Sequence, residues 1–240
     1  MKLSVVVPAF NEEKLITLSL GSIRGALDAN ARPGLDTELI VVDNNSTDRT
    51  ADLAREAGAT VCFEPVNQIA RARNTGAVAA SGDWLLFIDA DSFPTPALLS
   101  EVVALIDQDE VVGCGCIVRM EMPFWGRLSI GLWNRISMTF RWAAGSFILS
   151  RADAFRQIGG FDQKLYASEE INFSRRLKRW GRKRGKSFVI LRDHPLESSN
   201  RKVELYGQSE ILKALFRLAL RPRKSLRDKK YLGIWYDGRR

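Results

Sequence analysis

Short apolar segments alternate with longer segments of helical periodicity through the first half of the chain. Strands are predicted at residues 3–10 (LSVVVPAF), 38–42, 60–64 and 84–88. Helices are predicted between them, at residues 12–29, from Ser46 or Thr47 to Gly58, and at 69–80. Because this alternation makes successive strands parallel, the sequence predicts an α/β fold, a mostly parallel central sheet flanked by helices.

The second half continues the pattern less regularly. A helix opened by Pro94 and Pro96, strands at 111–120 and 145–149, a basic helix at 169–180 and an amphipathic helix at 203–220 are predicted. No linker or repeat divides the chain, and 240 residues with 45% hydrophobic content suffice for one core. We therefore expect one domain over residues 1–220, with a nucleotide-binding half (1–95) and an acceptor or catalytic half (96–220), followed by a basic tail (221–240).

Positive charge is concentrated near the end of the chain. Lys and Arg number 36 against 28 Asp and Glu, a formal charge of +8, and the excess lies in residues 171–192 and 221–240. Such segments suit phosphate, nucleic acid or an anionic membrane surface, or are simply solvated helix faces. No recognised nucleic-acid-binding motif accompanies them, so a nucleic acid partner is not expected.

The cysteines and the apolar segments indicate in which cellular compartment the protein is expected. Cys62, Cys114 and Cys116 are an odd number without metal-type spacing, which indicates reduced core residues of a cytoplasmic protein. Arg and Lys interrupt the longest apolar segments, so no membrane span is expected. We therefore expect a cytoplasmic protein, with peripheral contact at the inner face of the membrane as an alternative.

Acidic and amide side chains follow three of the predicted strands. They are Asn11, Glu12 and Glu13 after the first strand, Asp43, Asn44 and Asn45 after the second, and Asp89 and Asp91 after the fourth. Ligands of open parallel sheets bind at the carboxyl ends of the strands. Each group alone is equally compatible with turns and helix caps, but three on one edge indicate a polar ligand site.

Two carboxylates in the order Asp-Ala-Asp, at residues 89–91, favour a hard divalent cation. Mg²⁺ or Mn²⁺ held by one or two carboxylates completes its shell with water and phosphate oxygens, which implies a diphosphate ligand. Arg71 and Asn74 share a helix face just before this strand, and no acid lies four residues from Arg71 to pair with it. The dinucleotide and P-loop glycine motifs are absent, which argues against a dehydrogenase or an NTPase.

Five segments together resemble a known family. They are SVVVPAFNEE (4–13), LIVVDNNSTDRT (39–50), ARARNTGAVAASGDWLLFIDADSFP (70–94), AAGSFILSRADAFRQIGGFD (143–162) and SEEINFSRRLKRWGR (168–182). In order and spacing they resemble the nucleotide-sugar-dependent glycosyltransferases of family 2, whose Rossmann-like catalytic domain has the GT-A fold. The likeness spans about residues 3–180.

The resemblance implies roles for particular residues. Asp91 is implied as the main metal ligand with Asp89, and His194 as a further ligand, although a lone histidine is more often structural. The acidic pair Glu169-Glu170 stands where the family carries its general base, and either member can serve. The implied substrate-binding residues are Pro8, Phe10, Glu12, Asp43, Asn45, Arg71, Asn74, Asp89, Ala90, Gly145, Arg201 and Lys202.

The implied activity is metal-dependent, inverting transfer of a sugar from a nucleoside diphosphate sugar, UDP being favoured, to an acceptor hydroxyl. Absence of the Q-x-x-R-W motif of processive relatives predicts a single transfer. A polyprenyl phosphate acceptor at a membrane surface is the alternative, to which the aromatic segment 124–142 and the basic tail are suited. Two further alternatives are a nucleic-acid-binding protein and a protein that binds a nucleotide sugar without catalysing its transfer.

Overall fold

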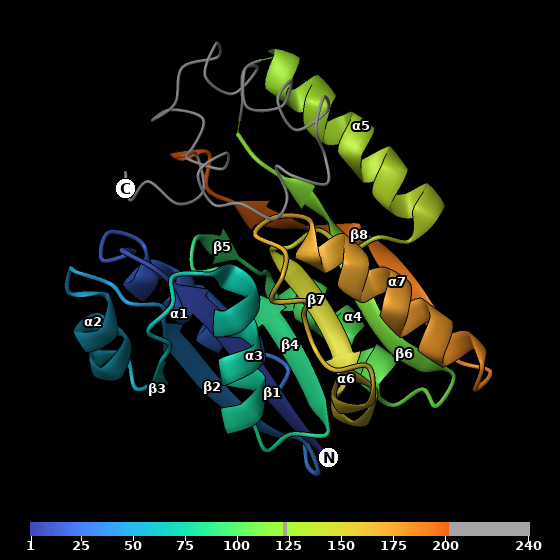
Figure 1. The fold of residues 1–240 in the computed structure, drawn as a ribbon, viewed down its shortest axis with the longest axis horizontal. Coiled ribbons are helices and arrows are strands. Elements are labelled where there is room, and N and C mark those ends of the chain that lie inside the picture. The colour runs from blue at the N-terminus through green and yellow to red at the C-terminus, as the bar shows by residue number, and fades with distance from the viewer. Residues whose placement is uncertain (122–123, 202–240) are drawn as a thin grey trace.

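The computed structural model describes residues 1–121 and 124–201, and one eight-stranded sheet runs through them in the order β3-β2-β1-β4-β7-β6-β8-β5 (Figure 1). The strands are β1 (Lys2–Ala9), β2 (Asp36–Asp43), β3 (Thr60–Phe63), β4 (Trp84–Ile88), β5 (Ser92–Phe93), β6 (Val111–Arg119), β7 (Phe147–Arg151) and β8 (Ser187–Ser198). The helices are α1 (Ile16–Asp28), α2 (Thr50–Glu56), α3 (Ile69–Ala79), α4 (Pro96–Ile106), α5 (Phe124–Phe140), α6 (Ala152–Gln157) and α7 (Glu169–Arg182).

The sheet is mixed, with a parallel majority. β1 pairs in parallel with β2 and β4, β2 with β3, and β6 with β8. β7 lies antiparallel between β4 and β6, and β5 pairs antiparallel with the end of β8. The predicted mostly parallel sheet is confirmed. Of the two reversed strands, β7 lies in the half of the chain where strand and helix patterns alternate least regularly, and β5 follows the turn after β4.

Each face of the sheet carries its own apolar core because side chains alternate along the strands. In β1, Val5 and Val7 join the core beneath α1, α2 and α4, whereas Val6 joins the core beneath α3, α6 and α7. All five residues of β4 are buried, which confirms the expectation of a strand covered on both faces. Figure 1 shows α3, α6 and α7 in front of the sheet and α5 outside this layer, at the upper right.

Helix α3 lies unusually close to the sheet. A Cβ atom built on Gly76 would meet the Val6 Cγ1 atom at 2.3 Å, so only glycine permits this approach. The close contact packs α3 directly on β1 and β2.

Most predicted elements are present, with three differences. α1 begins at Ile16 and α2 at Thr50, each later than expected, because the residues before them form hydrogen-bonded loops. β5, α6 and β8 were not predicted, and residues Phe124–Phe140 of the aromatic segment form the single helix α5. The predicted helix at 203–220 and the tail at 221–240 lie outside the described residues.

The three cysteines all lie within the described residues. Cys114 and Cys116 are buried, Cys62 is half-buried, and all three are free thiols. Burial raises the pKa of Cys62 and of both buried thiols, so they stay protonated. None of the helices in the described part of the chain combines the length and apolar character that a membrane span requires.

Candidate active site

The carboxyl ends of the central strands lie level with one another. Ala9 at the end of β1 pairs with Asp43 at the end of β2, and Val6 pairs with Phe87, which puts Ala9 level with Ala90. The strand order reverses at β1, with β2 and β3 on one side and β4 on the other. The polar residues after β1, β2 and β4 therefore meet at the topological switch point, where ligands of such sheets bind.

The loop after β2 is shaped by its own acidic residue. Asp43 is buried, and its Oδ1 atom accepts a hydrogen bond of 3.0 Å from the backbone N–H of Ser46. Between them, Asn45 adopts a left-handed conformation with φ of 66°. Asn44, which the sequence analysis gave no role, is buried and donates from Nδ2 to the carbonyls of Glu64 and Val66. The loop is thus held against the β3–α3 connection.

Ser46 and Thr47 do not cap α2, so that prediction is wrong. Ser46 Oγ accepts the N–H of Asn11 at 3.0 Å, and the N–H of Thr47 donates to Asn11 Oδ1 at 2.8 Å. Asp48 instead accepts the N–H of Thr50, the first residue of α2, at 2.9 Å. The two hydroxyl residues therefore join the loops that follow β1 and β2.

Glu12 pairs with a residue from the far end of the described chain. Its side chain is buried, and Oε2 accepts a hydrogen bond from Arg201 Nη2. Arg201 is also largely buried, yet its Nε and Nη1 atoms have no partner among the described residues. Pro8, at the level of Val42, is buried and Phe10 is half-buried. Lys202 lies outside the described residues.

Arg71 has an acidic partner that the sequence did not suggest. Its Nε atom lies 3.1 Å from Glu64 Oε1, and Nη1 donates to Gln163 Oε1 at 3.1 Å. Burial acts to raise the pKa of Glu64, but hydrogen bonds from Thr75, the Val66 N–H and Arg71 lower it below its usual value. Arg71 thus keeps a partly exposed guanidinium at the end of β3, although it is not the unpaired cation that its local sequence indicated.

Arg73 occupies the centre of the site. It is 1% exposed, and its Nη1 atom donates to Glu169 Oε1 at 2.7 Å. Its Nη2 atom donates to Asp89 Oδ1 at 3.0 Å and to the carbonyl of Gly145 at 2.7 Å. We call these four residues the Arg73 cluster. It joins α3, the end of β4, the segment before β7 and the start of α7.

The cluster places the acidic pair of α7 beside Gly145. Glu169 is buried and paired with Arg73, whereas Glu170 is partly exposed. A Cβ atom built on Gly145 would lie 3.7 Å from Glu170 Cγ and 3.8 Å from its Cδ. Glu170 therefore lies next to the backbone that the Arg73 cluster holds, with a carboxylate not committed to the Arg73 ion pairs.

Glu170 has a perturbed pKa. Burial of the carboxyl, followed by the charge of Glu169, raises the pKa of Glu170 to about 8, against the opposing influence of Arg73. A carboxylate with a pKa this high accepts a proton more readily than an ordinary one. Of the two glutamates, Glu170 has the exposure and the basicity that proton abstraction requires.

Asp89, Ala90 and Asp91 form the turn after β4. Asp89 accepts from Arg73, and the Asp91 carbonyl accepts the N–H of Ser199 at 2.9 Å. Within residues 1–121 and 124–201, no group donates a hydrogen bond to the buried Asp91 carboxylate. Two carboxylates at a strand end are hard oxygen ligands that suit Mg²⁺ or Mn²⁺. The described residues hold no group of three metal-ligating side chains, so water and phosphate oxygens would have to complete such a shell.

His194 lies apart from these carboxylates. Its Nδ1 atom is 2.7 Å from Glu101 Oε1, on α4, and its ring is half exposed. Ser199, which bonds to Asp91, follows five residues later, or about 16 Å along an extended strand. The structure therefore gives His194 a partner on α4 and does not bring it together with Asp89 and Asp91.

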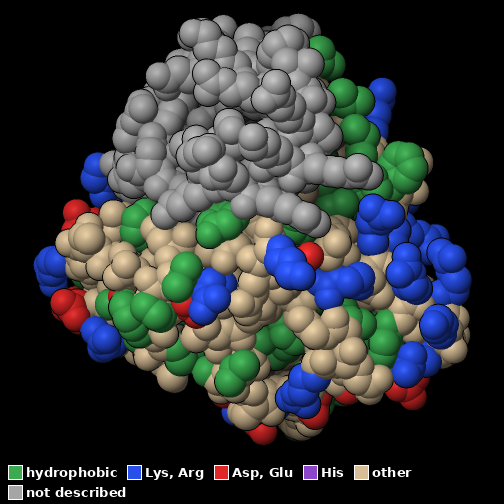
Figure 2. Space-filling model, in the orientation of Figure 1, with side chains coloured by type: hydrophobic (Ala, Val, Ile, Leu, Met, Phe, Trp, Pro, Cys, Tyr) green, Lys and Arg blue, Asp and Glu red, His purple; other side chains and the backbone are tan. Residues whose placement is uncertain are grey.

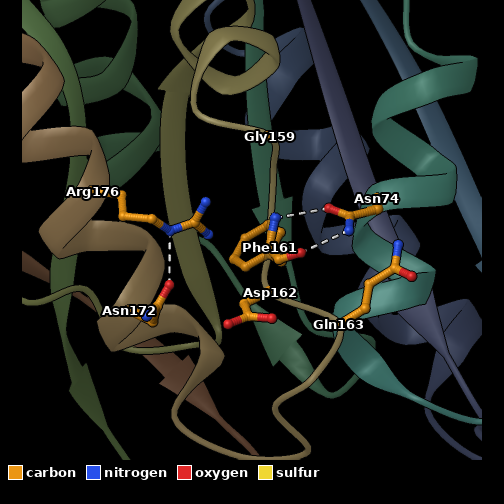
Figure 3. Close-up of a pocket in the computed structure, with 7 residues that line it drawn as sticks. All are labelled: Asn74, Gly159, Phe161, Asp162, Gln163, Asn172 and Arg176. Carbon is orange, nitrogen blue, oxygen red and sulfur yellow. Dashed lines mark hydrogen bonds between the residues drawn. The ribbon is translucent and has the colours of Figure 1, made fainter.

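A pocket of about 360 Å³ lies between α3 and α7 (Figure 3). Asn74 faces the turn before α7 and bonds to both the N–H and the carbonyl of Phe161 at 2.9 Å. Gly160 in this turn has φ of 63°, and a Cβ there would meet Asn74 Oδ1 at 2.6 Å, which only glycine avoids. From α7, Arg176 bonds to Asn172 and to the carbonyl of Ile158. Asn74 thus positions the turn that leads to Glu169 and is not directed at the strand ends.

Arg73 and Glu64 are the residues that the sequence analysis missed. Arg73 lies on the same face of α3 as Ala70 and Ala77, which are buried against the sheet. This spacing of i−3 and i+4 is a signal that could have marked Arg73 as an inward-facing cation. Glu64 carries no comparable signal, because its partners become neighbours only when β3 and α3 pack together.

Comparison with known proteins identifies a family model and relatives that resemble this chain in sequence. The family model described as Glycosyl transferase family 2 matches residues 4–158. Poly(ribitol-phosphate) beta-N-acetylglucosaminyltransferase TarS of Staphylococcus aureus is 32% identical over 115 residues, 45% of this chain and 19% of TarS. Dolichol-phosphate mannosyltransferase of Pyrococcus furiosus is 31% identical over 123 residues, 48% of this chain and 33% of that protein. The chain thus spans a third or less of the length of these relatives.

Solved structures share the fold. Mannosyltransferase PcManGT of Pyrobaculum calidifontis, in complex with GDP-Man and Mn²⁺, has a TM-score of 0.67 at 21% identity, over 90% of this chain and 60% of that one. Glucosyl-3-phosphoglycerate synthase of Mycobacterium tuberculosis, in complex with Mn²⁺, UDP and glucosyl-3-phosphoglycerate, has a TM-score of 0.62 at 23% identity, over 95% and 81%. With the family model matching well over half of the sequence, the chain belongs to glycosyl transferase family 2 and has the GT-A fold.

Proposed function

We propose that this glycosyltransferase moves one sugar from a nucleoside diphosphate sugar to an acceptor hydroxyl, with inversion at the anomeric carbon and without processivity. UDP is the favoured nucleotide, supported by the UDP in the mycobacterial synthase structure, although PcManGT carries GDP-Man. Residues 1–95 would bind the nucleotide and residues 96–220 the acceptor. Free cysteines support a reducing, cytoplasmic setting.

The Arg73 cluster is the observation that carries this proposal. One buried guanidinium contacts Asp89, of the metal-type motif, at 3.0 Å and Glu169, beside the candidate base, at 2.7 Å. It therefore fixes the distance between the group that would bind the diphosphate and the group that would activate the acceptor. Such preorganisation is what a direct displacement between two bound substrates requires. Arg73 acts here as a positioning residue.

Glu170 is the proposed general base. It takes the proton of the acceptor hydroxyl onto its carboxylate as the oxygen attacks the anomeric carbon and the bond to the diphosphate breaks. The donor sugar would lie beside Gly145, whose Cα faces the Glu170 side chain. Attack from the side opposite the leaving group gives inversion in a single step.

Asp91 and Asp89 would hold Mg²⁺ or Mn²⁺, and the Mn²⁺ in the two neighbouring structures supports this assignment. When bound, the ion supplies positive charge that neutralises the departing diphosphate. The buried Nε and Nη1 atoms of Arg201 have no hydrogen-bond partner among the described residues and could donate to a phosphate oxygen. Arg71 and Glu12 lie at the same edge and would contact the nucleotide with Pro8, Phe10, Asp43 and Asn45.

A thermal-shift assay tests the donor site. The protein is melted with UDP-, GDP-, CDP- and dTDP-sugars, with and without Mn²⁺ or Mg²⁺, as wild type, as Asp91→Ala and as the control Asp28→Ala, an exposed acid on α1. A donor at about 100 times its Kd stabilises the folded state by about 2.7 kcal/mol. We expect a metal-dependent shift that Asp91→Ala loses and Asp28→Ala keeps. Equal shifts in all three proteins would overturn the metal assignment.

A polyprenyl phosphate acceptor is a second candidate, favoured by exposed leucines on α5 and by the likeness to dolichol-phosphate mannosyltransferase. A phosphate acceptor is already anionic and needs little help from a base. This alternative predicts that Glu170→Gln retains most activity and that turnover requires detergent or lipid. A strong loss in Glu170→Gln with a soluble acceptor would exclude it.

A further inference from the structure

A second pocket of about 560 Å³ lies where the end of α5, the second half of α7 and the α7–β8 turn meet. Four of its lining residues are cationic: Arg141, Lys178, Arg182 and Lys186. We call this the basic pocket. Glu170 and Arg182 lie twelve residues apart on α7, about 18 Å along the helix axis, so this pocket is separate from the Arg73 cluster.

The cations of the basic pocket have no carboxylate partner among the described residues. Lys178 donates to the carbonyl of Phe140, and Lys186 to the carbonyl of Asp109. Burial, followed by the charges of Arg141, Arg182 and Arg175, lowers the pKa of Lys178. Like charges held together against this repulsion gain free energy when an anion binds among them.

Arg141 occupies a backbone position that ordinarily favours glycine. The N–H of Trp142 bonds to the carbonyl of Ser137 at 3.1 Å, which closes α5 with Arg141 at the left-handed position, φ of 51°. A non-glycine residue there costs about 1–2 kcal/mol of backbone strain. Helix termination alone does not call for an arginine, whereas a cation aimed at the basic pocket does.

One face of α5 leads from two exposed leucines to this pocket. Leu128, Leu132, Arg135 and Thr139 follow one another at spacings of four, three and four residues, which puts them on one helix face, and Thr139 lines the pocket. Leu128 is 67% and Leu132 59% exposed. Figure 2 shows hydrophobic side chains along the upper right edge, where α5 lies, and a concentration of Lys and Arg below them, toward α7.

We propose that the basic pocket binds the phosphate groups of an anionic lipid surface, with Leu128 and Leu132 entering the headgroup region. The juxtaposition carries the assignment. Basic side chains attract anionic headgroups, and neighbouring exposed apolar side chains gain by leaving water, whereas a nucleic acid or a free phosphate would use only the charges. The proposal is independent of the donor and of the base.

Vesicle co-sedimentation of the full chain tests the charged part. Vesicles of phosphatidylcholine alone are compared with vesicles that also contain phosphatidylglycerol. The test variant is Arg141→Gly/Arg182→Gln, in which glycine relieves the left-handed strain, and the control is Arg24→Gln/Arg156→Gln, two exposed arginines on α1 and α6. All proteins keep residues 202–240, so any contribution of the basic tail is common to every arm.

We expect wild type and control to bind the anionic vesicles alike and the test variant to bind about thirtyfold more weakly, at about 1 kcal/mol for each lost charge. Melting temperature and the donor-induced thermal shift verify that the variant is folded. If test and control variants bound the vesicles equally weakly, net charge alone would determine vesicle binding, and the proposal would be overturned. Unchanged vesicle binding in the test variant would overturn it as well.

A second pair of variants tests the apolar part. Leu128→Ser/Leu132→Ser is compared with Leu18→Ser, a leucine of α1 that is 63% exposed. We expect the α5 variant to bind anionic vesicles about tenfold more weakly and Leu18→Ser to bind like wild type. If the α5 variant binds like wild type, the leucines do not enter the headgroup region. A pocket-dependent thermal shift with inorganic phosphate or pocket-dependent RNA binding, without vesicle binding, would show a different anion and overturn the lipid assignment.

Discussion

The Arg73 cluster and the basic pocket place positive charge in opposite surroundings: the cluster holds one arginine between two acids, and the pocket holds four cations. Arg73 is buried to 1% exposure and lies within 3.0 Å of carboxylate oxygens of Asp89 and Glu169. In the basic pocket, Arg141, Lys178, Arg182 and Lys186 line a cavity without a carboxylate partner among the described residues. A compensated buried charge fixes the positions of its neighbours, whereas uncompensated charges at a surface remain available to a ligand.

Arg73→Met gives the largest expected effect. It leaves the buried Glu169 and the partly exposed Asp89 without their counter-charge, so the free energy of unfolding should fall by about 3–5 kcal/mol. Denaturant unfolding measures this value. Arg71→Met is the matched control: its pair with Glu64 is partly exposed and should cost less than about 1 kcal/mol. Equal losses in both variants would show that burial of Arg73 has no special role.

Glu170→Gln separates catalysis from stability. Loss of the proposed base should lower kcat by about 10²–10⁴-fold, with donor binding unchanged, because the amide cannot accept the acceptor proton. Steady-state kinetics with the wild type and with Glu110→Gln, an exposed acid, provide the comparison. A kcat within a few-fold of wild type would remove Glu170 from the mechanism.

The same residue makes stability depend on pH. The pKa of Glu170 in the folded state, about 8, lies above the ordinary value of 4.5, so the folded state retains a proton that the unfolded chain has released. The stabilisation of the folded state by the proton on Glu170 is therefore complete below about pH 4.5, and it is lost as the pH rises toward about 8. Denaturant unfolding across this range should show wild type losing stability relative to Glu170→Gln. Parallel profiles would contradict the raised pKa.

Arg182→Gln gives the smallest expected effect, of opposite sign to that of Arg73→Met. Removing one of several like charges should raise the free energy of unfolding by a few tenths of a kcal/mol at low ionic strength, and added salt should abolish the gain. Arg24→Gln should change nothing measurable. A loss of stability in Arg182→Gln would mean that Arg182 has a stabilising partner and that the basic pocket is not uncompensated.

The strand ends were predictable because the interactions that form them are local. The apolar run Trp84–Ile88 and the Asp89-Ala90-Asp91 turn lie next to each other in sequence, and β4 has the predicted bounds. Glu169 and Glu170 likewise begin α7, as predicted. A family resemblance carried by these same segments identified the fold.

The partners of the site residues were not predictable because they come from distant segments. Arg73 and Glu169 are 96 residues apart, and Arg201 and Glu12 are 189 apart. Arg71 and Arg73 are only two residues apart, yet α3 turns Arg71 toward solvent and Glu64 and turns Arg73 into the core. His194 lies on β8, a strand that the sequence analysis did not predict, and its partner Glu101 could not be foreseen.

The pH profile of kcat in wild type and in Glu169→Gln tests most directly whether Glu170 is the base positioned by the Arg73 cluster. In wild type we expect activity to rise with pH with an apparent pKa near 8. Glu169→Gln removes a neighbouring negative charge and leaves Arg73 to act on Glu170, so the profile should move to lower pH while turnover persists. Loss of turnover at every pH in Glu169→Gln, or an unmoved profile, would contradict this assignment.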